Sequence, residues 1–201
     1  MSDSEKYITV EGLTTAEFRD RGSRFLAFVQ PIVTPADARI WLAALRKEHP
    51  KANHHCLAYR IGADVRASDD GEPAGSAGRP MLGALDGAGL DRVGAIVVRY
   101  FGGTLLGVPG LINAYRTVVA DALRNATTVE RWIEDSFEIE CDYGNLGDVL
   151  RIVRMHEGTL IRQDLQLFCV VVAGLRKSAQ GPCLRALSDL RNVTVRPMPA
   201  V

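Results

Sequence analysis

The segment from Gly94 to Asn125 restricts the fold of this chain more than any other. Its first part, 94–101, reads GAIVVRYF, a continuous apolar and β-branched run that is typical of a buried strand. The glycine-rich sequence GGTLLGVPG follows over 102–110, and apolar residues then recur every three or four positions up to 125. This pattern predicts a strand, a tight loop and a helix packed on a sheet, which indicates a layered α/β domain.

The other elements before residue 127 fit the same architecture. We expect strands at 7–11, 23–33 and 54–62, and helices at 35–49 and 79–87. Residues 63–78, ADVRASDDGEPAGSAG, are predicted to form a long surface loop, and loops of this length are often functional. Twelve of the 19 glycines lie between Gly62 and Gly110, so the backbone there either turns sharply or is approached closely.

After a polar stretch at 127–135, which we interpret as a linker, the pattern restarts. Strands expected near 137–142, 159–162, 165–173 and 193–196 alternate with helices at 146–156 and 182–190. The order β-α-β-β-α-β is that of a ferredoxin-like domain. The sequence therefore predicts an α+β protein with an N-terminal α/β domain, 1–128, and a C-terminal ferredoxin-like domain, 129–201.

Charge and cysteine content exclude several classes of protein. The 24 basic residues equal the 24 acidic ones, so the chain does not coat nucleic acid through bulk positive charge. Its four cysteines are spaced singly, without the pairs of a zinc site or a disulfide framework. With no apolar run of membrane-spanning length and no secretory signal pattern, we expect a cytoplasmic protein without a membrane segment. We assign no cofactor and no metal ligand from the sequence, although a cation at the acidic loop described next stays open.

The expected loop carries three carboxylates, Asp69, Asp70 and Glu72, within four residues. They are compatible with a solvated acidic turn, with a hard cation such as Mg²⁺, or with a basic partner elsewhere in the fold. Ser76 lies just before the next helix. The free N–H groups at that helix start could receive a phosphate or carboxylate, or Ser76 could serve only as an N-cap.

A second candidate anion site lies where the buried strand ends, in the sequence Arg99-Tyr100-Phe101-Gly102-Gly103. Backbone amides at such a glycine pair can surround an anion, with the Arg99 guanidinium as a fixed planar charge. A second interpretation, compatible with the first, is that Arg99 pairs with one of the three acids and the glycines only let the chain turn.

The HHC sequence at 54–56 adds a candidate base. Because adjacent strand residues face opposite sides, only one histidine can face the same cleft, and His55 is the residue selected. Arg60 is a candidate phosphate contact, and Tyr100 and Tyr115 are candidate stacking residues for bases.

Four segments together resemble the YigZ/IMPACT family: HHCLAYRIG, SDDGEPAGSAGRPML, GAIVVRYFGGTLLG and GLINAYRTVVADAL. The resemblance implies an N-terminal fold like elongation factor G domain IV and a C-terminal one like its domain V. It also implies a role in translation, because eukaryotic members regulate the general-control stress response and bacterial members are described as nucleic-acid or ribosome binders. The chain departs from the family pattern at Ser76, at Val108-Pro109 and at Asn113.

Two functional hypotheses follow. In the first, a cleft containing the candidate residues binds a ribosome, structured RNA or a translation-factor partner. In the second, the same cleft holds a nucleotide or phosphorylated small molecule, and His55 or one of the acids is the catalytic base.

Overall fold

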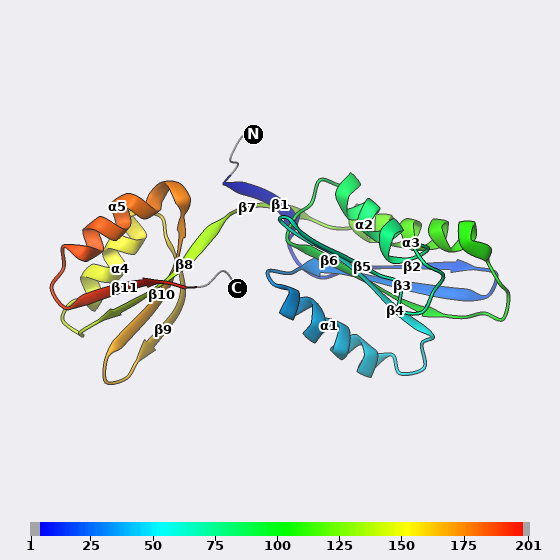
Figure 1. The fold of residues 1–201 in the computed structure, drawn as a ribbon, viewed down its shortest axis with the longest axis horizontal. Helices are drawn as coiled ribbons and strands as arrows, with labels where there is room; N and C mark the ends of the chain where they lie inside the picture. Colours follow the sequence, from blue (N-terminus) through cyan, green and yellow to red (C-terminus); the bar gives the residue numbers. More distant parts are fainter. Residues whose placement is uncertain (1–4, 199–201) are drawn as a thin grey trace. The chain divides into compact units, whose positions relative to one another are not determined.

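The computed structural model describes residues 5–198, which divide into two compact units. One unit consists of residues 7–131, and the other of residues 5–6 with 132–198. Each unit combines a β-sheet with helices, so the α+β class expected from the sequence is confirmed (Figure 1). The division lies at 131/132, inside a strand, whereas the sequence pattern suggested 128/129.

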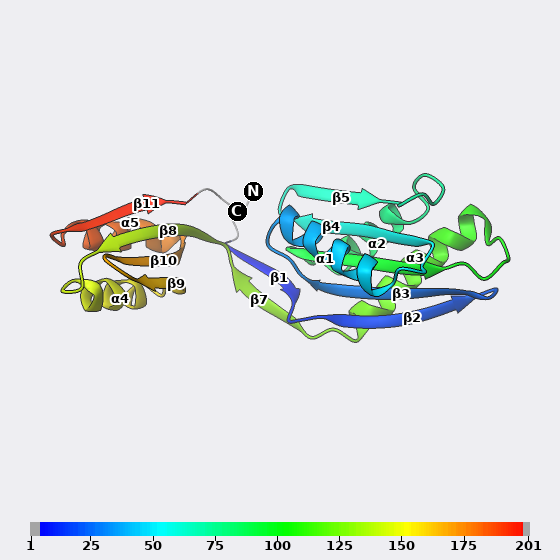
Figure 2. The same ribbon diagram turned by 90° about the horizontal axis from the view of Figure 1, so that it is seen from below.

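The first unit is built on one five-stranded antiparallel sheet. The strand order is β2 (Thr14–Asp20), β3 (Ser23–Pro31), β6 (Val93–Tyr100), β4 (His54–Ile61) and β5 (Asp64–Ser68) (Figure 2). Helices α2 (Gly78–Gly87) and α3 (Gly107–Arg124) cover one face, and α1 (Pro35–Glu48) covers the other (Figure 1). Strand β6 is therefore central and covered on both faces, as its apolar sequence predicts.

The period of two along the strands divides the core into two layers. In β3, Phe25, Ala27 and Val29 face α2 and α3, together with Val97 of β6. Their neighbours Leu26 and Phe28 of β3, with Ile96 and Val98 of β6, form the smaller layer beneath α1. Within each strand, successive residues thus alternate between the two layers, and the pairing register decides which residues of neighbouring strands share a layer.

Two strands of this sheet were not expected from the sequence. Strand β2 carries only two apolar side chains that pack on the core, Ala16 and Phe18, too few to stand out from its charged neighbours. Strand β5 lies within 63–78, which we predicted to be loop throughout, and four of its five residues are exposed. An edge strand with an exposed side gives little hydrophobic signal.

Helix α3 begins at Gly107 rather than at residue 111. Pro109 lies in its first turn, where a missing N–H costs no intrahelical hydrogen bond. The glycine-rich loop is correspondingly shorter than predicted.

The prediction of a linker at 127–135 is wrong, because much of this stretch is strand. Strand β7 (Thr128–Trp132) pairs with β1 (Lys6–Val10) in a two-stranded sheet (Figure 2). Just beyond β1, the backbone N–H of Glu11 donates to the carbonyl of Thr127 at 2.9 Å. The first and last strands around the N-terminal unit therefore lie side by side.

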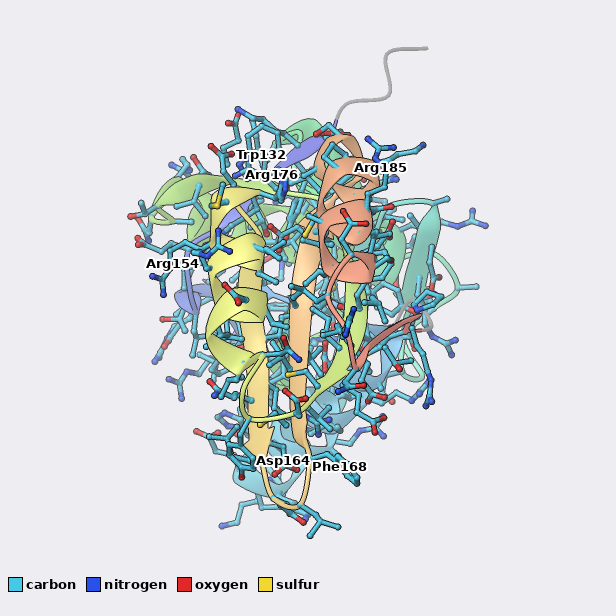
Figure 3. The ribbon with its side chains drawn as sticks, turned by 90° about the vertical axis from the view of Figure 1, so that its left-hand side faces the viewer. Trp132, Arg154, Asp164, Phe168, Arg176 and Arg185 are labelled. Carbon is cyan, nitrogen blue, oxygen red and sulfur yellow. The ribbon has the colours of Figure 1, made fainter. Side chains whose placement is uncertain are left out.

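The second unit has the predicted ferredoxin-like element order. It runs β8 (Glu134–Cys141), α4 (Leu146–Met155), β9 (Thr159–Leu165), β10 (Cys169–Arg176), α5 (Lys177–Ser188) and β11 (Val193–Pro197). The antiparallel sheet has the order β11-β8-β10-β9, and both helices cover one face, as seen in Figure 3. Alternate residues of β8 and β10, such as Ile139 and Val171, form the core beneath them. None of the helices in the described residues is long and apolar enough to cross a membrane.

Candidate functional site

Strand register brings the candidate site together on the side of the sheet covered by α2 and α3. His54 of β4 lies opposite Arg99 of β6, and Arg99 lies opposite Phe25 of β3. All three therefore share one face, at the end of the sheet where β6 leads into the glycine loop. Cys56, two residues along β4, shares this face as well.

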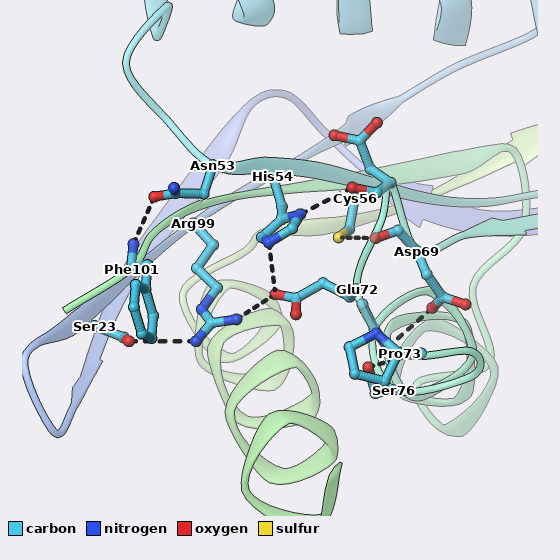
Figure 4. A network of polar contacts seen from close by, with 12 residues as sticks. Ser23, Asn53, His54, Cys56, Asp69, Glu72, Pro73, Ser76, Arg99 and Phe101 are labelled. Atoms are coloured by element: carbon cyan, nitrogen blue, oxygen red, sulfur yellow. Dashed lines mark hydrogen bonds and ion pairs between the residues drawn. The ribbon is translucent and has the colours of Figure 1, made fainter. Parts of the chain in front are cut away.

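Glu72 is at the centre of a buried polar network (Figure 4). The Arg99 guanidinium donates to its Oε1 at 2.6 Å, and the Tyr115 hydroxyl donates to the same oxygen at 2.7 Å. Nε2 of His54 lies 3.9 Å from Oε1. The side chains of Arg99 and Glu72 are only 5% and 3% exposed, so this ion pair is an interior one. Of the two alternatives for Arg99, the one observed is pairing with an acid of the loop.

Burial also sets the protonation of the groups around this pair. It raises the pKa of Tyr115 far above its usual value of 10, and Cys56 next to it adds to the shift. Burial likewise raises the pKa of the Cys56 thiol well above 9. The thiol lies 3.1 Å from the carbonyl oxygen of Asp69 and 3.4 Å from the Tyr115 hydroxyl. Cys56 is therefore a protonated structural thiol, unlike a nucleophilic cysteine, which acts as a thiolate.

Asp69 occupies the start of α2. Its carboxylate accepts backbone hydrogen bonds from Gly75 at 2.7 Å, Ala77 at 3.0 Å and Gly78 at 2.8 Å. Burial opposes ionisation, but these three donors outweigh it and keep the Asp69 pKa below its usual 3.8. Ligand binding by the amides at this helix start was one of two possibilities left open by the sequence. The amides of Gly75, Ala77 and Gly78 instead bind the chain's own carboxylate, so they are not free for a ligand.

Ser76 does not cap this helix either. Ala77 is the N-cap residue, and the buried Ser76 hydroxyl donates to the carbonyl of Pro73 at 2.6 Å. Ser76 thus closes the turn before α2 and does not point toward a ligand.

Asp70 forms the tight turn predicted for Asp-Gly, with a φ of +46° followed by +88° at Gly71. Its carboxylate accepts from Arg46 at 2.6 Å and from the backbone N–H of His55 at 2.7 Å. The three carboxylates are thus bound by basic groups or backbone amides. No cluster of three or more metal-ligating side chains occurs among residues 5–198.

Gly102 allows two backbones to come into contact. A Cβ at this position would lie 1.9 Å from the carbonyl carbon of Gly22, in the turn between β2 and β3. The Gly102 amide donates to Ser23 Oγ at 3.2 Å, so it is not free for an anion. Gly103, with a φ of +85°, has open space around its Cα and is exposed. Gly102 therefore fixes the loop against the β2–β3 turn, and Gly103 does not take part in this contact.

Three predicted residues lie away from this network. His55 and Tyr100 point to the α1 side, because each is one residue out of phase with His54 and Arg99. There the Tyr100 hydroxyl lies 2.9 Å from His49 Nδ1.

Arg60 lies near the opposite end of β4, where it donates to Asp86 at 2.6 Å. His54 belongs to the network but was not among the predicted residues, and its Nδ1 lies 2.8 Å from the Asp70 carbonyl oxygen. Strand periodicity places the two histidines on opposite faces of the sheet, but it does not determine which of them faces α2 and α3.

The exposed part of this region consists of the β2–β3 turn and the loop after β6. We name residues 19–24 and 101–108 together the loop end. Phe101, Leu105 and Val108 are 42%, 81% and 45% exposed. Arg19, Arg21 and Arg24 of the adjoining turn are exposed too. The Arg99 guanidinium lies between the rings of Phe25 and Phe101, at 5.3 and 5.6 Å from their centroids, and so connects the buried network to this surface.

Comparison with known proteins identifies relatives along most of the chain. Residues 21–123 match the Impact N-terminal domain. The chain is 38% identical to IMPACT family member YigZ of Escherichia coli, over 76% of this chain and 78% of that protein. It is 42% identical to an IMPACT family member of Thermus thermophilus, over 84% and 93% of the two chains.

A solved structure described as "Crystal structure of an hypothetical protein" has the same fold across both units. It covers 98% of this chain and 99% of its own, with a TM-score of 0.73 and 31% identity. The match to the family domain, the long alignments and this two-unit likeness agree with one another. The chain belongs to the IMPACT family.

Proposed function

We propose that this chain is a translation-associated regulatory protein that binds ribosomal or other structured RNA through the loop end. The observation that carries the proposal is that exposed Phe101 and three exposed arginines lie on two adjoining segments, which the contacts of Gly102 with Gly22 and Ser23 hold together. Family membership supports the setting, because the IMPACT resemblance implies a role in translation. The binding surface proposed here is not the predicted cleft, in which Glu72, Arg99 and Tyr115 are buried and bound to one another, but the surface that this network supports.

The loop end has the chemistry that structured RNA requires. Aromatic side chains stack on unpaired bases, and arginine contacts phosphate. Arg19 and Arg24 both bind Glu17, and these hydrogen bonds lower the Glu17 pKa to about 2. The arginines are therefore partly neutralised, so we expect a modest salt dependence and selectivity for a particular shape rather than coating of RNA.

Rigidity favours binding, because a preorganised loop loses less entropy when it meets a partner. The Phe101 amide donates to the Asn53 side chain at 2.8 Å, and the next residue contacts Gly22. Below them, the Arg99–Glu72 pair holds the guanidinium against the Phe101 ring. The network thus has a positioning role for the binding surface.

The test is retention of the purified full chain on ribosomes and on a hairpin RNA over a range of salt concentrations. We expect Phe101→Ala and Val108→Ala to weaken retention, with Phe101→Ala the stronger because stacking on a base contributes about 1–3 kcal/mol. Val65→Ala is the matched control, since Val65 is 44% exposed on β5 and lies outside the loop end. Absence of salt-dependent retention at low ionic strength, or equal losses in Val108→Ala and Val65→Ala, would overturn the proposal.

A further inference from the structure

Strand β9 is an outer edge of the C-terminal sheet. Within residues 5–198, β10 is its only strand partner. All seven β9 residues are exposed. The backbone N–H and C=O groups of alternate residues point away from an edge, where they are able to pair with another strand.

Exposed apolar side chains accompany this edge. Five large ones lie within nine residues of β9 and the hairpin tip: Leu160 at 49%, Ile161 at 55%, Leu165 at 48%, Leu167 at 87% and Phe168 at 57%. Figure 3 shows Asp164 and Phe168 together at the end of the hairpin. Single exposed apolar residues are ordinary, but a contiguous group along an open edge is typical of a contact surface.

The charges on β9 indicate what the edge contacts. Arg162 and Asp164 flank Gln163, and their neighbours across the ladder on β10 are Val172 and Val170. Each charge therefore lies opposite an apolar residue within its own sheet. Proteins commonly protect an edge with charges that repel a second copy. Here the two charges have opposite signs and are placed symmetrically about one residue.

That symmetry matches a second copy of the same strand. If two β9 strands pair antiparallel with Gln163 opposite Gln163, each Arg162 lies opposite the other copy's Asp164, and this occurs twice. Opposite charges directly across an antiparallel pair are stabilising, whereas like charges are destabilising. A two-fold axis makes such a contact self-complementary and closed.

The same register places the hairpin tip of one copy near the end of α4 in the other. Leu165, the last residue of β9, falls opposite the second copy's Ile161, and the bend at 166–168 continues toward the second copy's Met155 at the end of α4, which is 68% exposed. The apolar tip thus has an apolar neighbour to cover. The register shift between Leu160 and Arg162 interrupts the ladder at Ile161 and limits regular pairing to a few residues. The contact should therefore be weak and dependent on concentration.

We propose that β9 is a self-association edge and that two copies of this chain pair through it, antiparallel and centred on Gln163. The proposal is independent of RNA binding at the loop end.

Sedimentation velocity of the full chain across a wide concentration range tests it. We expect the wild type to dimerise reversibly. Arg162→Asp and Asp164→Arg should each weaken dimerisation by about tenfold or more, because each places like charges opposite one another twice. An equimolar mixture of the two variants should dimerise again, since opposite charges then face each other at both positions. The double variant R162D/D164R should also recover.

Arg185→Asp is the matched control, because it makes the same charge change at an exposed position on α5, away from β9 (Figure 3). It should dimerise like the wild type. The proposal would be overturned if the wild type stayed monomeric at the highest concentration, or if the Arg162→Asp variant dimerised as well as the wild type. It would also be overturned if the mixture of Arg162→Asp and Asp164→Arg associated no better than either variant alone.

Discussion

Glu72→Gln is the substitution that probes the buried network most directly. It preserves the shape of the side chain but leaves the Arg99 guanidinium, 5% exposed, without a counter-charge. Removing one member of a buried ion pair typically costs about 3–5 kcal/mol. We expect the lower end, about 3 kcal/mol, because the amide oxygen can still accept one hydrogen bond. For a unit of roughly 125 residues, about 4 °C of Tm per kcal/mol gives a decrease of about 12 °C.

The unfolding of the N-terminal unit has to be followed separately, because a chain with two units need not unfold in one step. Each unit contains one of the two tryptophans, Trp41 and Trp132. Trp132→Phe therefore leaves Trp41 of α1, which packs against the core layer between that helix and the sheet, as a fluorescent reporter of the first unit alone. The Tm of the Trp132→Phe variant is then compared with and without the additional Glu72→Gln change.

Glu17→Gln is the control for this measurement, since Glu17 binds two arginines at the surface and an exposed pair contributes about 1 kcal/mol or less. A double-mutant cycle with Arg99→Met should give a coupling energy of about 1–3 kcal/mol, because the second change removes the unpaired charge. If Glu72→Gln lowers Tm no more than Glu17→Gln, the buried pair does not hold this part of the fold together and our reasoning fails.

Three further predictions concern single positions. Gly102→Ala should destabilise the first unit by about 3 kcal/mol or more, because the added methyl group would overlap a neighbouring backbone. Gly103→Ala should cost about 1 kcal/mol, from its positive φ alone. Equal losses of the free energy of unfolding in urea would refute the close contact at Gly102. The Asp69 pKa is lowered in the folded protein, so the stabilising contribution of the Asp69 carboxylate should be complete above pH 4 and disappear as the pH falls further. In a pH series of unfolding curves, Asp69→Asn should reduce this dependence of stability on acid. Burial lowers the His55 pKa below 6.5, so protonation favours the unfolded chain and stability should decline as the pH drops below 6.5. If His55→Leu shows the same decline of stability, groups other than His55 cause it.

Local patterns in the sequence predicted the elements that carry a strong periodic signal. The apolar run of β6, the helix α1 and the ferredoxin-like order after residue 133 were all recognisable; in the structure, Thr34 and Pro35 stand at the start of α1. Asp37 completes the α1 cap by accepting from the Thr34 amide at 2.8 Å. These features depend on residues a few positions apart, so a single sequence contains them in full.

The arrangement of the site depends on register, which a single sequence does not contain. Whether His54 or His55 faces the helices is decided by pairing with Arg99, 45 positions away along the chain. Asp69 was recognised as a functional candidate, but its role at the start of α2 depends on how the preceding turn folds back. Of the strands that were not predicted, β2 and β5 are edges of the five-stranded sheet whose exposed residues resemble loop in composition.

The pairing of β1 with β7 has a consequence for how the chain can be cut and rejoined. The chain enters the first unit in β1 and leaves it in β7, and these two strands are paired. In topology, residues 7–131 are therefore an insertion between Lys6 and Trp132 of the second unit. Glu5 belongs to that second unit and accepts from the backbone N–H of Ser178 at 2.7 Å. A fragment that starts at residue 129 would therefore lack a piece of its own domain. A short bridge that joins residue 6 to residue 132 would keep that piece, and the excised cassette, its ends already adjacent, could be circularly permuted or inserted into another host protein.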